Sequence, residues 1–365
     1  MARIDAFLKL GLTQGCSDVH LAVGIPPMLR MSGELMPIKF RDLTPQELQS
    51  YLTEILSPAQ DAAFRRGEDL DFSYVSEEGA RLRVNAFHKS SGIGAVFRYI
   101  PNDIPEIDRL GLPHAVRDLC HNHQGLILVT GASGTGKSTT LAAMIDYLNT
   151  EFSHNIITLE DPIEFVHPPK KAQVIQRELG THLDSFADGL RAALRQDPDV
   201  ILVGELRDAE TMSMAMMAAE TGHLVLGTMH TTGAVKTVDR VLDALPSELR
   251  EQTKSFLSQS LIGVISQVLV KTPDNRDRRA VLEIMIVTRA IANLINNDQT
   301  HQIPSQLQTG KHLGMQLMDQ ALFDAVQAKD INPNDAYLYA TEKARFERFV
   351  TDIELLPERN KGPGL

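Results

Sequence analysis

The sequence predicts an α/β protein in which a small α+β domain, residues 1–100, precedes a parallel-sheet domain, residues 109–270. Short apolar runs alternate with helix-like segments between residues 125 and 244, which is typical of a parallel sheet covered by helices. Pro101 and Pro105 disfavour both helix and strand, so residues 101–108 are expected to form a linker. Residues 271–365 are expected to be mostly helical and to end in a tail, with one further strand at residues 280–286.

The first 100 residues contain signals for helices and for a hairpin. Residues 6–12 favour a helix, and the alternation over residues 18–23 favours a strand. Apolar runs on both sides of Ser32-Gly33 predict a hairpin. Thr44 followed by Pro45 is a helix start signal, and this helix is expected to reach residue 56.

A second hairpin is predicted around Ser90-Ser91, between the runs RLRVNAF (81–87) and GAVFRYI (94–100). In that register Arg83 lies directly opposite Arg98. Like charges that face each other destabilise a sheet, so the pair is understandable if an anion bridges the two arginines. The alternative is two solvated arginines in a slipped register.

The segment GASGTGKSTT, residues 131–140, follows an apolar strand and precedes a helix. The spacing of Gly131, Gly136, Lys137 and Ser138 fits the phosphate-binding loop of nucleotide hydrolases. In such a loop, backbone N–H groups and the lysine bind phosphates, and the Ser hydroxyl binds Mg²⁺. The expected nucleotide-binding residues are Ser133, Gly134, Thr135, Gly136, Lys137, Ser138 and Thr139.

Acidic and histidine residues follow three other apolar strands. Glu164 comes shortly after residues 156–159, Glu205 follows VILV (200–203), and His230 follows LVLGTM (224–229). Because ligands bind beyond the carboxyl ends of such strands, we expect these side chains near the phosphate loop. Glu205 fits a role in holding Mg²⁺, directly or through water, and Glu164 a role in polarising the attacking water, although the reverse assignment fits as well. His230 is expected near the γ-phosphate, whereas His223 lies at the other end of its strand, roughly 23 Å away.

Composition excludes several classes of protein. The net charge of −11 argues against a general nucleic-acid binder. Two cysteines, Cys16 and Cys120, are too few for a four-thiolate zinc site. The first residues lack the apolar core of a secretory signal, and the longest uncharged stretch, residues 256–270, is too short to cross a bilayer. A cytoplasmic location is therefore expected.

Three longer motifs are more specific than the phosphate loop. They are ITLEDPIEF (157–165), QDPDVILVGELRD (196–208) and AAETGHLVLGTMHTT (218–232). With the loop, they resemble the Asp box, Walker B and His box of additional-strand secretion ATPases, most closely the type IV pilus retraction ATPases of the PilT family. The resemblance extends from residue 17 to about residue 325. It implies a PAS-like N-terminal domain, a RecA-like ATPase domain with a helical C-terminal part, and a hexameric ring. It also implies that Arg83 and Arg98 reach nucleotide.

The resemblance predicts a cytoplasmic homohexameric ATPase that uses ATP and Mg²⁺ to drive pilus retraction, pilin disassembly and twitching motility. Its expected partners are the inner-membrane pilus platform protein and a paralogous retraction ATPase, and no nucleic acid is expected. Extension and secretion relatives usually carry an extra N-terminal domain and a four-cysteine element; this sequence has neither the length nor the cysteines for them, so the retraction type is expected. However, residues 290–295 read AIANLI, with Ala292 where the retraction type has arginine, so an auxiliary paralogue is an alternative. A related secretion, extension or nucleic-acid-translocating motor, or a ring that binds ATP without useful turnover, are further alternatives.

Overall fold

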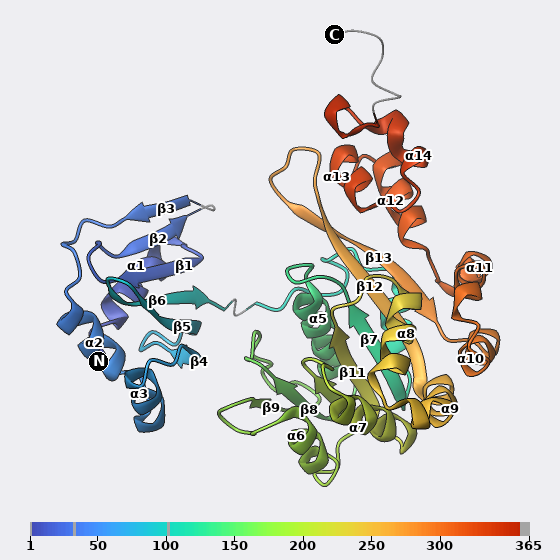
Figure 1. Cartoon of the computed structure of the whole chain (residues 1–365), viewed down its shortest axis with the longest axis horizontal. Helices are drawn as coiled ribbons and strands as arrows, with labels where there is room; N and C mark the ends of the chain where they lie inside the picture. Colours follow the sequence, from blue (N-terminus) through green and yellow to red (C-terminus); the bar gives the residue numbers. More distant parts are fainter. Residues whose placement is uncertain (1, 32–33, 101–102, 358–365) are drawn as a thin grey trace. The chain divides into compact units, whose positions relative to one another are not determined.

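The computed structural model describes residues 2–31, 34–100 and 103–357, and the chain forms two compact units, each with its own sheet (Figure 1). The first unit comprises Met1–Asp103 and Pro162–Val166, and the second comprises Ile104–Asp161 and His167–Leu365. The α/β prediction is confirmed, because an antiparallel sheet and a mostly parallel sheet both carry helices. The residues expected to form the hairpin turn at Ser32-Gly33, and Pro101-Asn102 of the expected linker, lie outside the described residues.

The first unit is built on an antiparallel sheet with the strand order β3-β2-β1-β6-β5-β4. One face of this sheet, with side chains such as Val19, Leu82 and Phe97, packs on three helices and forms the core. The second of these helices begins as expected, because Thr44 and Glu47 form a capping box there. The elements are β1 Asp18–Ala22, β2 Met28–Met31, β3 Glu34–Pro37, β4 Leu70–Val75, β5 Arg81–Lys89, β6 Gly92–Tyr99, α1 Asp5–Gln14, α2 Pro45–Thr53 and α3 Pro58–Arg65.

The hairpin of β5 and β6 has the predicted register, with Arg83 opposite Arg98. Carboxylates of the same chain lie beside both arginines. The Nε of Arg98 donates to the buried Asp18 on β1 at 2.7 Å, and the Nε of Arg83 lies 3.7 Å from Asp71 on β4. Asp18 also lies 3.8 Å from Arg30 on β2. A carboxylate next to each arginine therefore lowers the repulsion that the facing pair would otherwise suffer.

The second unit is built on a sheet with the strand order β13-β12-β7-β11-β10-β8-β9. Neighbours from β12 to β9 are parallel, and β13 is antiparallel to β12 at the edge. The sequence pattern predicted all of these strands except β9 and β12. The strands are β7 Gly125–Thr130, β8 Asn155–Glu160, β9 Gln173–Glu178, β10 Val200–Val203, β11 Leu224–Met229, β12 Leu261–Lys271 and β13 Arg278–Ile286.

Helices cover both faces of this sheet (Figure 1). The side chains of β7 point alternately to the two faces of the sheet. Ile127 and Val129 face α4 and α5, whereas Leu126 and Leu128 face α6 to α9. These helices are α4 His114–Cys120, α5 Lys137–Glu151, α6 Phe186–Ala193, α7 Ala209–Glu220, α8 Ala234–Ala244 and α9 Arg250–Ser260.

The last part of the chain is mostly helical, as expected, and the expected strand is β13. The far ends of β12 and β13 pack through Val270 and Val281 on a separate apolar cluster formed with α12, α13 and α14. The helices are α10 Arg289–Asn296, α11 Ile303–Thr309, α12 Met318–Gln327, α13 Pro333–Tyr339 and α14 Lys343–Phe346; short 3₁₀ turns occupy Ser247–Leu249, Thr300–Gln302, Gly310–Leu313, Glu347–Phe349 and Ile353–Leu355. The expected tail, residues 358–365, lies outside the described residues. Within the described part of the chain, no helix is both long and apolar enough to span a membrane.

Candidate nucleotide site

The predicted phosphate loop connects β7 to the N-terminus of α5. Gly136 precedes the first helical residue and has φ +87°, a left-handed conformation that glycine adopts without strain. A Cβ on Gly136 would lie 2.9 Å from Nε2 of Gln267, and one on Gly131 would collide with the main-chain oxygen of Gln267. Glycine is therefore required at both positions by close packing as well as by conformation.

The side chain of Lys137 lies against the main chain of this loop. Its ammonium donates to the main-chain oxygens of Gly131 at 2.8 Å and Ala132 at 2.9 Å, and the residue is only 9% exposed. Thr135 closes the loop by donating its hydroxyl to Ala132 at 2.9 Å. The cation is thus held at the place where a phosphate group would meet the N-terminus of α5.

The other predicted loop residues differ in exposure. Ser133, Gly134 and Ser138 are exposed, whereas Gly136 and Thr139 are half-buried. The hydroxyl of Ser138, one residue after Lys137, is therefore accessible to a ligand of the loop.

Glu205 is fixed just beyond the end of β10. The preceding Gly204 packs closely on the neighbouring strand, where an added Cβ would lie 3.1 Å from the main-chain oxygen of Leu159. The hydroxyl of Thr228 on β11 donates to the oxygen of Gly204, and Leu206 N–H donates to the oxygen of Thr228 at 2.9 Å. The backbone on both sides of Glu205 is therefore anchored to adjacent strands.

The carboxylate of Glu205 is mostly buried and lies between two basic groups. Oε2 is 2.6 Å from Arg207, and Oε1 is 3.1 Å from Nε2 of His230. Burial raises the pKa of Glu205, but the hydrogen bonds and charges of Arg207 and His230 outweigh it and bring the pKa below its usual range. Glu205 is therefore an anion at neutral pH. The sequence pattern did not single out Arg207.

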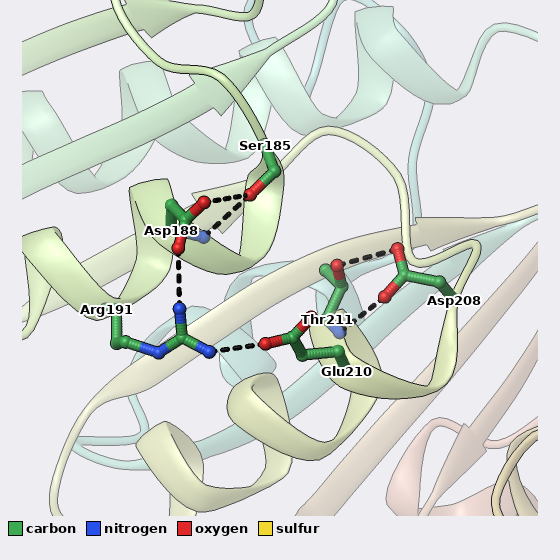
Figure 2. Close-up of polar contacts among 6 residues, drawn as sticks. All are labelled: Ser185, Asp188, Arg191, Asp208, Glu210 and Thr211. Carbon is green, nitrogen blue, oxygen red and sulfur yellow. Dashed lines mark hydrogen bonds and ion pairs between the residues drawn. The ribbon is translucent and has the colours of Figure 1, made fainter.

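The start of α7 is held by the network in Figure 2. Asp208 caps the helix, accepting from the N–H and the hydroxyl of Thr211 at 2.8 Å each. Arg191 of α6 pairs with Asp188 on its own helix at 2.6 Å and with Glu210 on α7 (Figure 2). The short segment that carries Glu205 is thus anchored at both ends, by β10 and by α7.

The register of the sheet brings three of the predicted stations to one edge. β7, β11 and β10 are parallel neighbours, and Gly131 N–H donates to the oxygen of Met229 at 3.3 Å. Lys137, Glu205 and His230 therefore follow the carboxyl ends of adjacent strands. Glu164, half-buried in the Pro162–Val166 segment, belongs to the first unit. Arg83 and Arg98 belong to the first unit too.

His223 lies at the amino end of β11, where its main-chain oxygen accepts from Gly125 N–H at 3.0 Å. It is thus at the opposite end of the strand from His230, as expected. Among the described residues, no group of three or more His, Cys, Asp or Glu side chains could hold a metal by itself. A hydroxyl at Ser138 and a carboxylate at Glu205 nevertheless fit Mg²⁺, which typically binds through one or two protein oxygens together with substrate phosphates.

Gln267 on β12 is the clearest residue that the sequence analysis missed. It is 2% exposed and donates Nε2 to the main-chain oxygen of Thr135 at 2.6 Å. Its Oε1 accepts from the hydroxyl of Thr140 at 2.7 Å. The polar pair Ser266-Gln267 within a mostly apolar run was the available signal, because a buried amide needs polar partners.

Comparison with known proteins agrees with this geometry. The family model of type II/IV secretion system proteins matches residues 4–332. The chain belongs to this family. The type IV pilus retraction ATPase PilT of Pseudomonas aeruginosa is 48% identical over 319 residues, 87% of this chain and 92% of that protein. The PilU pilus ATPase of the same organism is 36% identical, covering 92% of this chain and 88% of that protein.

Within the family, a crystal structure of the pilus retraction motor PilT with bound ADP superimposes with a TM-score of 0.88. The two sequences are 42% identical, and the superposition covers 95% of this chain and 100% of the PilT chain. The chain is therefore a PilT-family ATPase. These relatives confirm the family and the activity predicted from the motifs.

Proposed function

We propose that this chain is the subunit of a homohexameric ring that hydrolyses ATP to power type IV pilus retraction, with pilin disassembly and twitching motility as the outcome. The observation that supports it is the group of Lys137, Glu205 and His230 at one sheet edge, in a chain similar to a retraction ATPase over most of its length. The ring works at the cytoplasmic face of the inner membrane. There it acts on the pilus platform protein, together with a paralogous retraction ATPase.

The chemistry is transfer of the γ-phosphoryl group to water, which depends mainly on positioning and on neutralising charge. Lys137 exchanges the loop oxygens for the β- and γ-phosphates, and His230 approaches the γ-phosphate. Ser138 and Glu205 would hold Mg²⁺, Glu205 directly or through water, and the bound ion would supply neutralisation of the phosphate charge. Glu164 orients the attacking water. The opposite assignment of the two glutamates fits the same positions, and substitution of each residue distinguishes the two.

Arg83 and Arg98 complete the site from a neighbouring subunit, as arginine fingers do. The Nε of Arg98 donates to Asp18, and the Arg98 side chain is 67% exposed, so its terminal N–H groups can donate to a further anion. ATP then bridges two subunits, and hydrolysis releases one contact between them. This links the chemistry to movement of the docked platform.

Subunit mixing tests the arrangement. Arg98→Ala and Lys137→Ala subunits should each be nearly inactive alone, because each lacks one half of every site. Mixed under subunit exchange, they should regain part of the activity, since an intact phosphate loop can then lie beside an intact arginine. Arg83→Ala with Lys137→Ala should behave in the same way. If no ratio restores phosphate release in rings of verified size, the arginines act within their own subunit or not at all.

A cellular measurement separates the candidate functions. Deletion of the gene should give hyperpiliated, non-twitching cells if the protein is the main retraction motor. A much weaker defect would favour an auxiliary paralogue, the alternative suggested by Ala292 in α10. Loss of pili would favour an extension motor. Negligible phosphate release by wild-type rings would favour a structural ring.

A further inference from the structure

We propose that Gln267 is a positioning residue for nucleotide binding. Its side-chain amide, on β12, holds the phosphate loop in its ligand-binding conformation. The amide joins the main-chain oxygen of Thr135, inside the loop, to the hydroxyl of Thr140, in the first turn of α5. Both bonds come from β12, a strand that contributes no predicted catalytic residue.

The bond to Thr135 fixes the orientation of one peptide group. In a planar trans peptide, C=O and N–H point in opposite directions. Because Gln267 donates to the oxygen of Thr135, the N–H of Gly136 is directed away from Gln267. That N–H is one of the loop donors expected to bind phosphate. Rotation of this peptide would instead turn a carbonyl oxygen toward the phosphates and repel them.

The surroundings of Gln267 leave the amide little freedom. It is 2% exposed and bonded at both ends, and a Cβ on Gly136 would come within 2.9 Å of its Nε2. The adjacent Ser266 accepts from Gly233 N–H at 2.8 Å, in the segment after His230. One strand therefore supports two loops at the carboxyl edge of the sheet, and Gln267 supports the loop that binds phosphate.

This role predicts a particular kinetic pattern. The loop contacts phosphates in the ground state and the transition state alike, so its loss should weaken ATP and ADP binding together. For Gln267→Met, which preserves much of the volume, we expect the Kd for ADP and the KM for ATP to rise about tenfold. The kcat should stay within about threefold of wild type, because Lys137 and Glu205 are unchanged. Gln316→Met is the matched control, since Gln316 donates to Leu282 at 2.8 Å away from the loop and should leave the Kd unchanged.

Gln267→Glu separates positioning from packing. An ionised carboxylate has no donor for the oxygen of Thr135, whereas the protonated acid has one. Burial favours the neutral acid, so affinity for ADP, relative to wild type at the same pH, should recover as the pH falls from roughly 8 to roughly 6. A residue that merely fills space would give no such recovery. This arm remains informative even if Gln267→Met folds poorly.

Thr140→Val completes a double-mutant cycle. It removes the hydroxyl that donates to Oε1, so its effect on ADP affinity should largely disappear when Gln267 is already methionine. Binding is measured by calorimetry with ADP alone, on rings of verified size. The proposal is supported by higher Kd and KM at nearly constant kcat, non-additivity and recovery at low pH. Wild-type affinity in Gln267→Met, a loss confined to kcat, or a pH-independent defect in Gln267→Glu would overturn it.

Discussion

Removal of the Asp18 carboxylate should destabilise the sheet of the first unit selectively. Asp18 lies opposite Arg30 on one side and opposite Arg98 on the other, and Arg98 in turn lies opposite Arg83. Four charged residues thus form a row across adjacent strands, with one carboxylate among three arginines. Asp18→Ala removes that carboxylate and leaves the three cations.

The magnitude follows from burial and contact. Asp18 is 2% exposed, and its charge-assisted hydrogen bond to Arg98 is 2.7 Å long. Such a bond contributes about 1.5–3 kcal/mol, and each like-charge pair across strands costs about 0.2–1 kcal/mol. Because 67% of the Arg98 side chain is exposed, solvent screening places the bond near its lower value. We expect a loss of about 2 kcal/mol, which corresponds to an about 30-fold faster amide exchange.

Hydrogen exchange followed by mass spectrometry on the full chain reports this loss locally. Peptides from β1 and β6 should lose protection, whereas peptides from β7 and β11 should not. Raising the salt from roughly 0.05 M to roughly 0.5 M should restore part of the protection, because the remaining repulsion is screened.

Asp71→Ala is the control for this prediction. Its side chain is 54% exposed and lies 3.7 Å from Arg83, so protection should change by less than about threefold. Unchanged protection in Asp18→Ala, or an equal loss in Asp71→Ala, would refute the reasoning that the buried carboxylate balances the row.

Three further predictions concern the second unit and Glu164. Lys137→Ala should lower ATP hydrolysis at least about a hundredfold with the fold retained, and near-normal turnover would contradict the assignment of the loop cation. Glu164→Gln should abolish hydrolysis yet keep ATP bound, whereas Glu205→Ala should also change the Mg²⁺ dependence; equal, modest losses with unchanged Mg²⁺ titrations would argue against both roles. Burial lowers the pKa of His167 from 6.5 to about 4, so the unfolded chain takes up its proton first and stability should fall as the pH drops from 6.5 toward 4. At ~1.4 kcal/mol per pKa unit, the loss in the free energy of unfolding reaches about 3 kcal/mol. His167→Asn should therefore flatten the acid side of the pH–stability curve. The control His301→Asn, at an exposed position, should leave the curve unchanged.

Local patterns were enough to predict the phosphate loop and the facing arginines. The phosphate loop is recognised from residues that are consecutive in the sequence. The hairpin is recognised from its two-residue connection, which sets the register that places Arg83 opposite Arg98. The apolar strands of the second sheet, buried on both faces, could be found as continuous runs. The edge strand β9 could not, because four of the six residues in its sequence QVIQRE are polar or charged and its side chains are mostly half-buried.

Partners distant in the sequence could not be predicted from one chain. Asp18 and Arg98 are 80 residues apart, and Thr140 and Gln267 are 127 apart. Their contacts depend on which strands become neighbours, and no local spacing encodes that. The sequence therefore predicted which residues bind phosphate and showed which carry charge, but it did not predict the contacts that Asp18 and Gln267 make with them.

The edge hairpin of β12 and β13 has a mechanical consequence. Gln267 touches the phosphate loop, and only four residues later Lys271 N–H donates to Asp335 of α13 at 2.8 Å, while its oxygen accepts from Asn332 at 2.7 Å. At ~3.3 Å per residue, the two contacts are roughly 13 Å apart along one extended strand. An extended strand braced by its neighbour can be neither stretched nor shortened appreciably, so it acts as a strut. Movement of the phosphate loop along this strand would therefore be transmitted to α13.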